Sequence, residues 1–148
     1  MRVFDYTSGD TALTVEGEKL VTFKPHGHWT RSLLVSPDGT KIYAGVGSLS
    51  NIGDAGMDVE EGRAAIWELD VATGNARIFA SGLRNAVGMA WEPETGKRWT
   101  VVNERDGLGD ETPPDYLTSV QEGGFYGWPY CYWGKTVDDR VPQDPKMV

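Results

Sequence analysis

Two histidines, His26 and His28, stand directly before an apolar run, a tight turn and a second apolar run. Histidine ordinarily titrates near neutral pH, so an imidazole can take up and release a proton under physiological conditions. An imidazole at the mouth of a β-hairpin is therefore either incidental or a catalytic base that faces a pocket. Which of the two holds depends on the elements that position it.

Composition limits the class of protein. The chain has 148 residues, 39% of them hydrophobic and 24% charged, which is enough for one domain with a hydrophobic core. Its 14 basic and 22 acidic side chains give a net charge of −8, which repels phosphates and argues against a nucleic-acid partner. The single cysteine, Cys131, can form no intrachain disulfide and is expected to be a small buried side chain.

The N-terminal residues carry no export signal. Residues 1–6 lack the apolar segment of a secretory signal, and no stretch approaches the roughly 18 apolar residues of a membrane span. The C-terminal residues 141–148 close no predicted element. The sequence thus predicts a soluble chain that is cut at both ends.

Short apolar runs alternate with turn signals, and this pattern predicts antiparallel hairpins. The paired runs are 33–35 with 42–46, 64–69 with 76–80, and 87–91 with 99–102. Gly39 and Gly74 supply the positive-φ positions that the first two turns require. With 19 Gly, 8 Pro and no helical pattern, the chain is expected to be all-β.

An internal repeat predicts how the hairpins assemble. Residues 33–47 align with residues 89–103, so that Pro37 matches Pro93. A unit of about four strands that repeats every 40 residues or more is typical of a β-propeller blade. We expect about two to three blades of four antiparallel strands over residues 1–148, which is too few to close a ring. Either the chain is a fragment of a longer protein, which its ends favour, or copies associate as a homo-oligomer.

Three segments in this order resemble the glucose/sorbosone dehydrogenase family, which depends on pyrroloquinoline quinone (PQQ). They are residues 27–48, 81–96 and 101–134, and the stretch 123–129 is the most distinctive of their parts. The resemblance, to the soluble aldose sugar dehydrogenase and L-sorbosone dehydrogenase type, implies a six-bladed β-propeller that oxidises a sugar with PQQ and Ca²⁺. It also implies an external electron acceptor and a periplasmic or secreted location.

The resemblance assigns roles to single residues. His28 would be the base that takes the hydroxyl proton while hydride leaves the sugar carbon, and His26 would be a solvated neighbour. Arg84 would stabilise the charge that arrives on the quinone, which is a tricarboxylate, and Asn85 would hydrogen-bond its ring system. Without the resemblance, the sequence favours a structural interpretation for both residues: His28 as a strand-entry residue hydrogen-bonded to the backbone, and Arg84 as a surface charge. Arg31 lies one position from the family's arginine and receives no role.

The resemblance also implies a calcium site built from main-chain carbonyls. The matching positions are Asp106 and Gly107, in the loop after the strand that ends at residue 102. Asp110, Glu111 and Asp115 follow them, but their spacing is not that of an EF-hand loop. These three carboxylates are expected to belong to a solvated loop.

One position departs from the family pattern. Many of these dehydrogenases carry an aspartate after the Val-Gly of the second strand, where it orients the imidazole, and this chain has Ser48. A serine accepts a hydrogen bond but supplies no negative charge. Either the base is weaker, or another carboxylate such as Asp54 or Asp58 takes its place.

The segment 123–134 is rich in glycine and aromatic residues. Aromatic side chains that stack on sugars and those that fill the space between blades look alike in sequence. The glycines indicate a tightly turning segment, so we expect Trp128 to be a packing residue and leave Tyr126 open.

Two other functions stay open. A propeller with an acidic loop could be a calcium-dependent lactonase or esterase, in which the metal activates water, or a non-catalytic interaction module. Because further cofactor-binding residues of the family would lie beyond Val148, these 148 residues alone are expected to bind the quinone weakly and to turn over no sugar.

Overall fold

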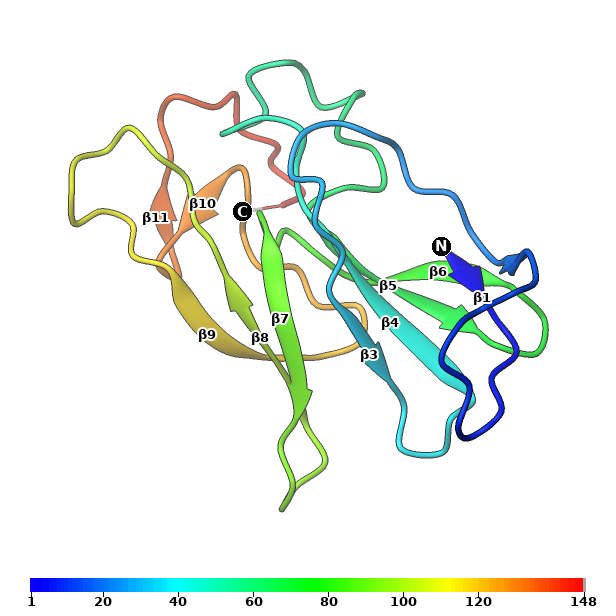
Figure 1. Cartoon of the computed structure of the whole chain (residues 1–148). Helices are drawn as coiled ribbons and strands as arrows, with labels where there is room; N and C mark the ends of the chain where they lie inside the picture. The colour runs from blue at the N-terminus through cyan, green and yellow to red at the C-terminus, as the bar shows by residue number, and fades with distance from the viewer. Residues whose placement is uncertain (148) are drawn as a thin grey trace.

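The computed structural model describes residues 1–147, and every regular element in that range is a β-strand (Figure 1). This confirms the predicted all-β class. The same residues contain no helix that could span a membrane. The strands are β1 (Arg2–Val3), β2 (Glu18–Lys19), β3 (Leu33–Val35), β4 (Lys41–Val46), β5 (Ala65–Asp70), β6 (Ala76–Ser81), β7 (Ala86–Trp91), β8 (Arg98–Val102), β9 (Tyr116–Val120), β10 (Cys131–Tyr132) and β11 (Thr136–Val137).

The first large sheet has the strand order β3-β4-β5-β6 and contains the first two predicted hairpins. At the turn between β3 and β4, Gly39 has a φ of 73°, which residues with a Cβ rarely adopt. The Asp38 carboxylate closes this turn by accepting hydrogen bonds from the Ser36 hydroxyl and the Thr40 amide. Both hairpin predictions are confirmed.

The second large sheet has the order β7-β8-β9, and its β7–β8 pair is the third predicted hairpin. β9 is not evident from the sequence, since Thr118 and Ser119 interrupt its apolar pattern. The expectation of four strands in each blade was therefore right for the first sheet only. Within residues 1–147 the second sheet has three strands.

The two sheets pack against each other, with β7 in contact with both β3 and β4. The Trp91 indole N–H donates to the Val35 carbonyl at 2.7 Å, so positions 56 residues apart that the repeat aligns are also in contact. The buried core between the sheets consists of Tyr43, Ile66, Phe79, Ala80, Leu83, Ala86, Val102 and Val120. This packing sets how the loops at the ends of the sheets face each other.

One cation lies inside this core. The guanidinium carbon of Arg98, on β8, is 3.5 Å from the centre of the Tyr43 ring and 4.0 Å from that of Phe79. A cation over aromatic faces is attracted by their negative electrostatic potential. Burial lowers the pKa of Arg98, yet an arginine remains protonated. Arg98 thus joins the second sheet to the aromatic side chains of the first.

Candidate functional site

Four loops meet at one end of the two large sheets (Figure 1). They are residues 24–32 before β3, 47–64 after β4, 82–85 before β7 and 103–115 after β8. In an antiparallel pair the start of one strand lies beside the end of the next, so these loops share one end. Every residue predicted for the site lies in them.

His28 is held by the end of β4. Its amide donates to the Ser48 carbonyl at 3.0 Å, and its ring Nδ1 lies 2.9 Å from the same oxygen. A carbonyl oxygen only accepts, so Nδ1 carries the hydrogen, and in the neutral ring the lone pair is then on Nε2. The Ser48 hydroxyl, 3.2 Å from Nδ1, donates to the Ser50 carbonyl. The half-buried imidazole is therefore in the tautomer that a base acting through Nε2 requires.

Within residues 1–147 no carboxylate forms a hydrogen bond or an ion pair with this imidazole. Asp54 and Asp58 are exposed, and no hydrogen bond or ion pair there joins either of them to His28. The backbone amide of Ile52 donates to the Asp54 carboxylate and lowers its pKa. Asp54 therefore stabilises the local turn at residues 52–54. Neither residue takes the place of the family aspartate.

Gly47, in the second loop, lets the first and third loops approach each other. A Cβ on Gly47 would lie 2.5 Å from His28 Cβ and 2.5 Å from Asn85 Oδ1, so a glycine allows both side chains to approach. The Ser48 amide donates to the Arg84 carbonyl at 2.8 Å, and the Asn103 amide to the Asn85 carbonyl at 3.0 Å. The Arg84–Asn85 pair is thus fixed between β4 and β8.

The Asn85 side chain is buried without a hydrogen-bond partner among residues 1–147. Its Oδ1 is fully enclosed and unpaired, although the residue as a whole is 8% exposed. A buried polar atom with no partner costs free energy, and such atoms are rare in folded proteins. The amide beside the imidazole therefore has hydrogen-bonding capacity that the described residues leave unused.

Arg84 is a buried cation surrounded mainly by neutral acceptors. Its guanidinium donates to the Asn51 carbonyl at 3.0 Å, the Asn51 Oδ1 at 2.9 Å and the Glu104 carbonyl at 2.7 Å. The Asp106 carboxylate lies 3.4 Å away and is exposed to solvent. Burial lowers the pKa of Arg84, and Asp106 opposes that effect, so the group stays charged. Asn51, which sequence reasoning missed, thus holds the guanidinium.

Two further arginines shape the loop before β3. The buried Arg63 donates to the carbonyls of residues 24–26, and Arg31 donates to the His28 carbonyl at 2.6 Å. The expected neighbour His26 is exposed and contributes its carbonyl to Arg63. These contacts link residues up to 39 positions apart, so no local pattern could have predicted them.

The donors at the predicted calcium positions do not fit that ion. The Asp106 carbonyl accepts hydrogen bonds from Asn51 Nδ2 at 3.0 Å and from Arg140 Nη1 at 3.2 Å. A Cβ on Gly107 would lie 3.1 Å from the same Arg140 nitrogen. Ca²⁺ needs six to eight oxygen ligands, and guanidiniums beside the loop repel a cation. Within residues 1–147 no three His, Cys, Asp or Glu side chains form a metal site.

The acidic residues after this loop differ from one another. Asp110 and Glu111 are exposed, as expected of a solvated loop. Asp115 is also exposed, but it accepts hydrogen bonds at 2.8 Å from the Glu104 amide and from Asn103 Nδ2. Asp115 therefore closes the loop that carries the Arg84 acceptors.

Arg105 anchors that loop in the interior. Its fully buried guanidinium lies 3.1 Å from Glu104 and 3.1 Å from Asp138, and it donates to the carbonyls of Pro129 and Cys131. Asp138 is also buried and pairs with Arg140 at 2.8 Å. Buried charges of this kind are stable only as complete pairs, so this network keeps the backbone of residues 104–106 in place.

The network predicts a loss of stability in acid. Hydrogen bonds from Arg140, and then from Arg105, lower the pKa of Asp138 to about 2, against about 3.9 in an unfolded chain. Its contribution of about 2.6 kcal/mol is complete above about pH 5 and is lost as the pH falls through about 2. Urea unfolding at pH 7 and at pH 2.5 measures this loss. Asp138→Asn should remove that part of the pH dependence, whereas Asp139→Asn, at an exposed neighbour, should keep it.

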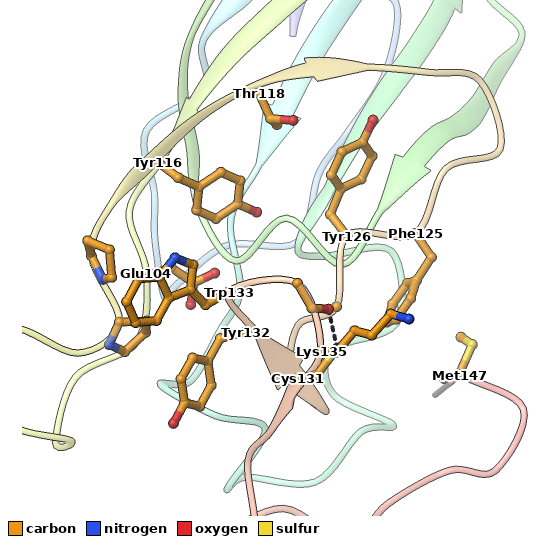
Figure 2. A pocket seen from close by; sticks show the side chains of 14 residues that line it. Glu104, Tyr116, Thr118, Phe125, Tyr126, Cys131, Tyr132, Trp133, Lys135 and Met147 are labelled. Carbon is orange, nitrogen blue, oxygen red and sulfur yellow. Dashed lines mark hydrogen bonds between the residues drawn. The ribbon is translucent and has the colours of Figure 1, made fainter.

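A cavity borders the fourth of these loops, from which Glu104, Pro113 and Pro114 line it. It has a volume of about 890 Å³, and Figure 2 shows aromatic side chains of β9 and of residues 125–133 around it. None of the residues predicted for the site lines it. Trp128 is 2% exposed, which confirms its packing role, and the buried Cys131 is free, as expected. The Tyr126 hydroxyl donates to the Ser119 carbonyl at 2.8 Å, so this side chain has a structural partner.

The chain is similar to known proteins in sequence and in fold. The family model described as TrAA12-like matches residues 1–144. A PQQ-dependent sugar dehydrogenase of Hypocrea jecorina is 27% identical over 159 residues, which cover 88% of this chain and 37% of that protein. The calcium structure of the Trichoderma reesei Carbohydrate-Active Enzymes Family AA12 protein has a TM-score of 0.64 at 27% identity, covering 74% of this chain and 33% of that one.

A further likeness concerns the fold alone. The holo form of the pyranose dehydrogenase PQQ domain from Coprinopsis cinerea has a TM-score of 0.66 at 22% identity, covering 96% of this chain and 42% of that one. The two large sheets are accordingly blades of a β-propeller, as predicted. The chain spans about a third of the length of the curated relatives it matches.

Proposed function

The chain belongs to the TrAA12-like family, and from this membership we propose that it forms part of the active site of a quinoprotein sugar dehydrogenase. Its relatives include PQQ-dependent sugar dehydrogenases. The observation that supports the site is that the His28 and Asn85 side chains meet at Gly47, at one end of two adjacent blades, while the main chain of Arg84 is bonded to Ser48. A base, an unpaired amide and a buried cation form a set that can bind a polar substrate and take the proton of its hydroxyl group.

His28 is the proposed general base. Because Nδ1–H is directed at the Ser48 carbonyl, Nε2 can accept the hydroxyl proton of a sugar. Oxidation of that hydroxyl to a carbonyl removes this proton and a hydride from the adjacent carbon. His28 takes the proton, so the hydride needs a separate acceptor.

A quinone that carries carboxylates would be held here by the Asn85 amide and by the charge of Arg84, whose N–H groups already donate to Asn51, Asn103, Glu104 and Asp106. The Asn85 amide, which lacks a partner within residues 1–147, would hydrogen-bond the ring system, and the buried Arg84 charge would stabilise negative charge on it. When bound, PQQ supplies the acceptor for the hydride. The Asp106 loop does not fit Ca²⁺ in its present arrangement, so we derive no step through that ion.

The rest of the proposal concerns the whole protein. We propose an aldose or a sorbosone-like sugar as substrate, an external electron acceptor, and a periplasmic or secreted location. Residues 1–148 would be part of one β-propeller domain, and further blades would complete its ring. This agrees with the greater length of the relatives. These residues alone would then bind PQQ weakly and turn over no sugar.

The other two functions have less support. A calcium-dependent hydrolase needs oxygen ligands that face a metal, and the Asp106 carbonyl is already engaged by Asn51 and Arg140. A non-catalytic module gives no reason for an imidazole with a free Nε2 beside an unpaired buried amide. No observation on the chain favours either of them specifically.

A quinone titration tests the proposal. PQQ added to the protein with all of its blades should shift its absorbance and saturate one site. Asn85→Ala should raise the dissociation constant about tenfold, because one hydrogen bond to the ligand is lost. Asn75→Ala, in the exposed turn after β5, should leave the constant unchanged. Lactone hydrolysis with no quinone shift would favour the hydrolase and overturn the proposal.

A further inference from the structure

Glu60 is a buried carboxylate in the loop after β4 that takes no part in the proposed reaction. It is 4% exposed, and among residues 1–147 no cation lies within ion-pair distance of it. A buried carboxylate without a counter-ion is costly unless hydrogen bonds satisfy it. Its position therefore calls for an explanation.

Three donors from an earlier segment of the same loop, residues 49–50, satisfy this carboxylate. Oε2 accepts from the Leu49 amide at 2.7 Å, and Oε1 accepts from the Ser50 amide at 2.8 Å and from the Ser50 hydroxyl at 2.6 Å. Hydrogen bonds to a charged acceptor are the strong ones. Glu60 thus fixes the backbone of residues 48–50.

One of these hydrogen bonds connects Glu60 to the imidazole. The Leu49 N–H and the Ser48 C=O belong to the same peptide group, and that carbonyl accepts from Nδ1 of His28 at 2.9 Å. Hydrogen bonds in a chain polarise one another. A negative charge at the N–H end therefore makes the carbonyl end a better acceptor for Nδ1–H.

We infer that Glu60 is a positioning residue for His28 and acts on the imidazole through the peptide group between Ser48 and Leu49. Ser48 has no carboxylate of its own, so the polarised peptide group transmits the negative charge of Glu60 to Nδ1 of His28. Glu60 holds the tautomer in which Nε2 is free, and it favours the imidazolium that forms when Nε2 takes a proton. The inference rests on the proposed function of His28 for its catalytic consequence, but the effect on the tautomer does not depend on it.

The test measures the tautomer of His28 directly. Protein labelled with ¹⁵N-histidine is compared by NMR with Glu60→Gln, and the His28 signals are assigned by their loss in His28→Gln. The wild-type ring should carry its hydrogen on Nδ1 at neutral pH, and Glu60→Gln should move a measurable fraction of it to Nε2. In the loaded enzyme the same change should lower kcat about tenfold and leave KM within about twofold. Glu61→Gln, at the exposed neighbour, should change neither.

Each outcome decides between the two hypotheses. An unchanged tautomer in folded Glu60→Gln overturns the inference, whatever happens to activity. A changed tautomer in a protein that oxidises no sugar supports the positioning role and contradicts the proposed dehydrogenase function. If Glu60→Gln does not fold, the wild-type spectrum is sufficient, because a hydrogen on Nε2 there contradicts the inference by itself.

Discussion

Replacing His28 with glutamine is expected to lower kcat/KM for sugar oxidation by about 10²- to 10⁴-fold, the usual contribution of a general base. Glutamine keeps a polar side chain in the loop before β3, beside the end of β4, but it cannot accept a proton at neutral pH. Nε2 is the one ring nitrogen that the Ser48 carbonyl leaves free, so no other atom of this side chain can replace it. Reduction of an external dye by the PQQ-loaded protein measures the rate.

The matched control is the other histidine. His26 is exposed and has a φ of 70°, a conformation that asparagine also tolerates, so His26→Asn should fold and keep its rate within about twofold. PQQ binding should be retained in both variants, because neither imidazole is assigned to the quinone. A His28→Gln protein that oxidises sugar at the wild-type rate would exclude His28 as the base.

Gly47→Ala is expected to cause the second large loss, although it adds a single methyl group. The new Cβ would lie 2.5 Å from both His28 Cβ and Asn85 Oδ1, which real Cβ atoms do not tolerate. The two side chains have to move apart, and a displacement of about 1 Å in an active site can cost about 10²-fold in rate. We also expect a stability loss of about 1–3 kcal/mol from the overpacking, measured by urea unfolding.

A second glycine provides the control for this change. Gly88, in β7 of the neighbouring blade, has no heavy atom within 4 Å of the position that a Cβ would take. Gly88→Ala should therefore keep both its rate and its PQQ affinity. Equal activity in the two alanine variants would show that His28 and Asn85 need not be close for the reaction.

The hairpins could be predicted from the sequence because they depend on neighbours in the chain. Apolar runs separated by turns such as that at Asp38 and Gly39 satisfy their own backbone hydrogen bonds, so the pattern is local. β9 could not be predicted in this way. Its residues alternate weakly between apolar and polar, and they form a strand because β8 lies beside them with unpaired backbone groups.

The candidate residues His28, Arg84 and Asn85 came from motifs, but nothing in a motif states what surrounds them. Arg84 is held by Asn51, 33 residues earlier, and Asn51 in turn contacts Asp106, 55 residues later. Neither Asp54 nor Asp58 is hydrogen-bonded to the imidazole. Glu60, further along the loop, instead accepts from the Leu49 amide, whose peptide group also carries the Ser48 carbonyl bonded to His28. Sequence spacing carries no information about such contacts.

The sequence alone determines the order of the strands, the turns and the polar residues of the loops. These features depend on apolar periodicity and on hydrogen bonds between residues close together in the chain. The tautomer of His28, the lack of a partner for Asn85 and the engagement of the Asp106 carbonyl follow from packing two sheets together. That packing brings four loops to one end, and the free energy of each polar group there depends on donors and acceptors from the other three.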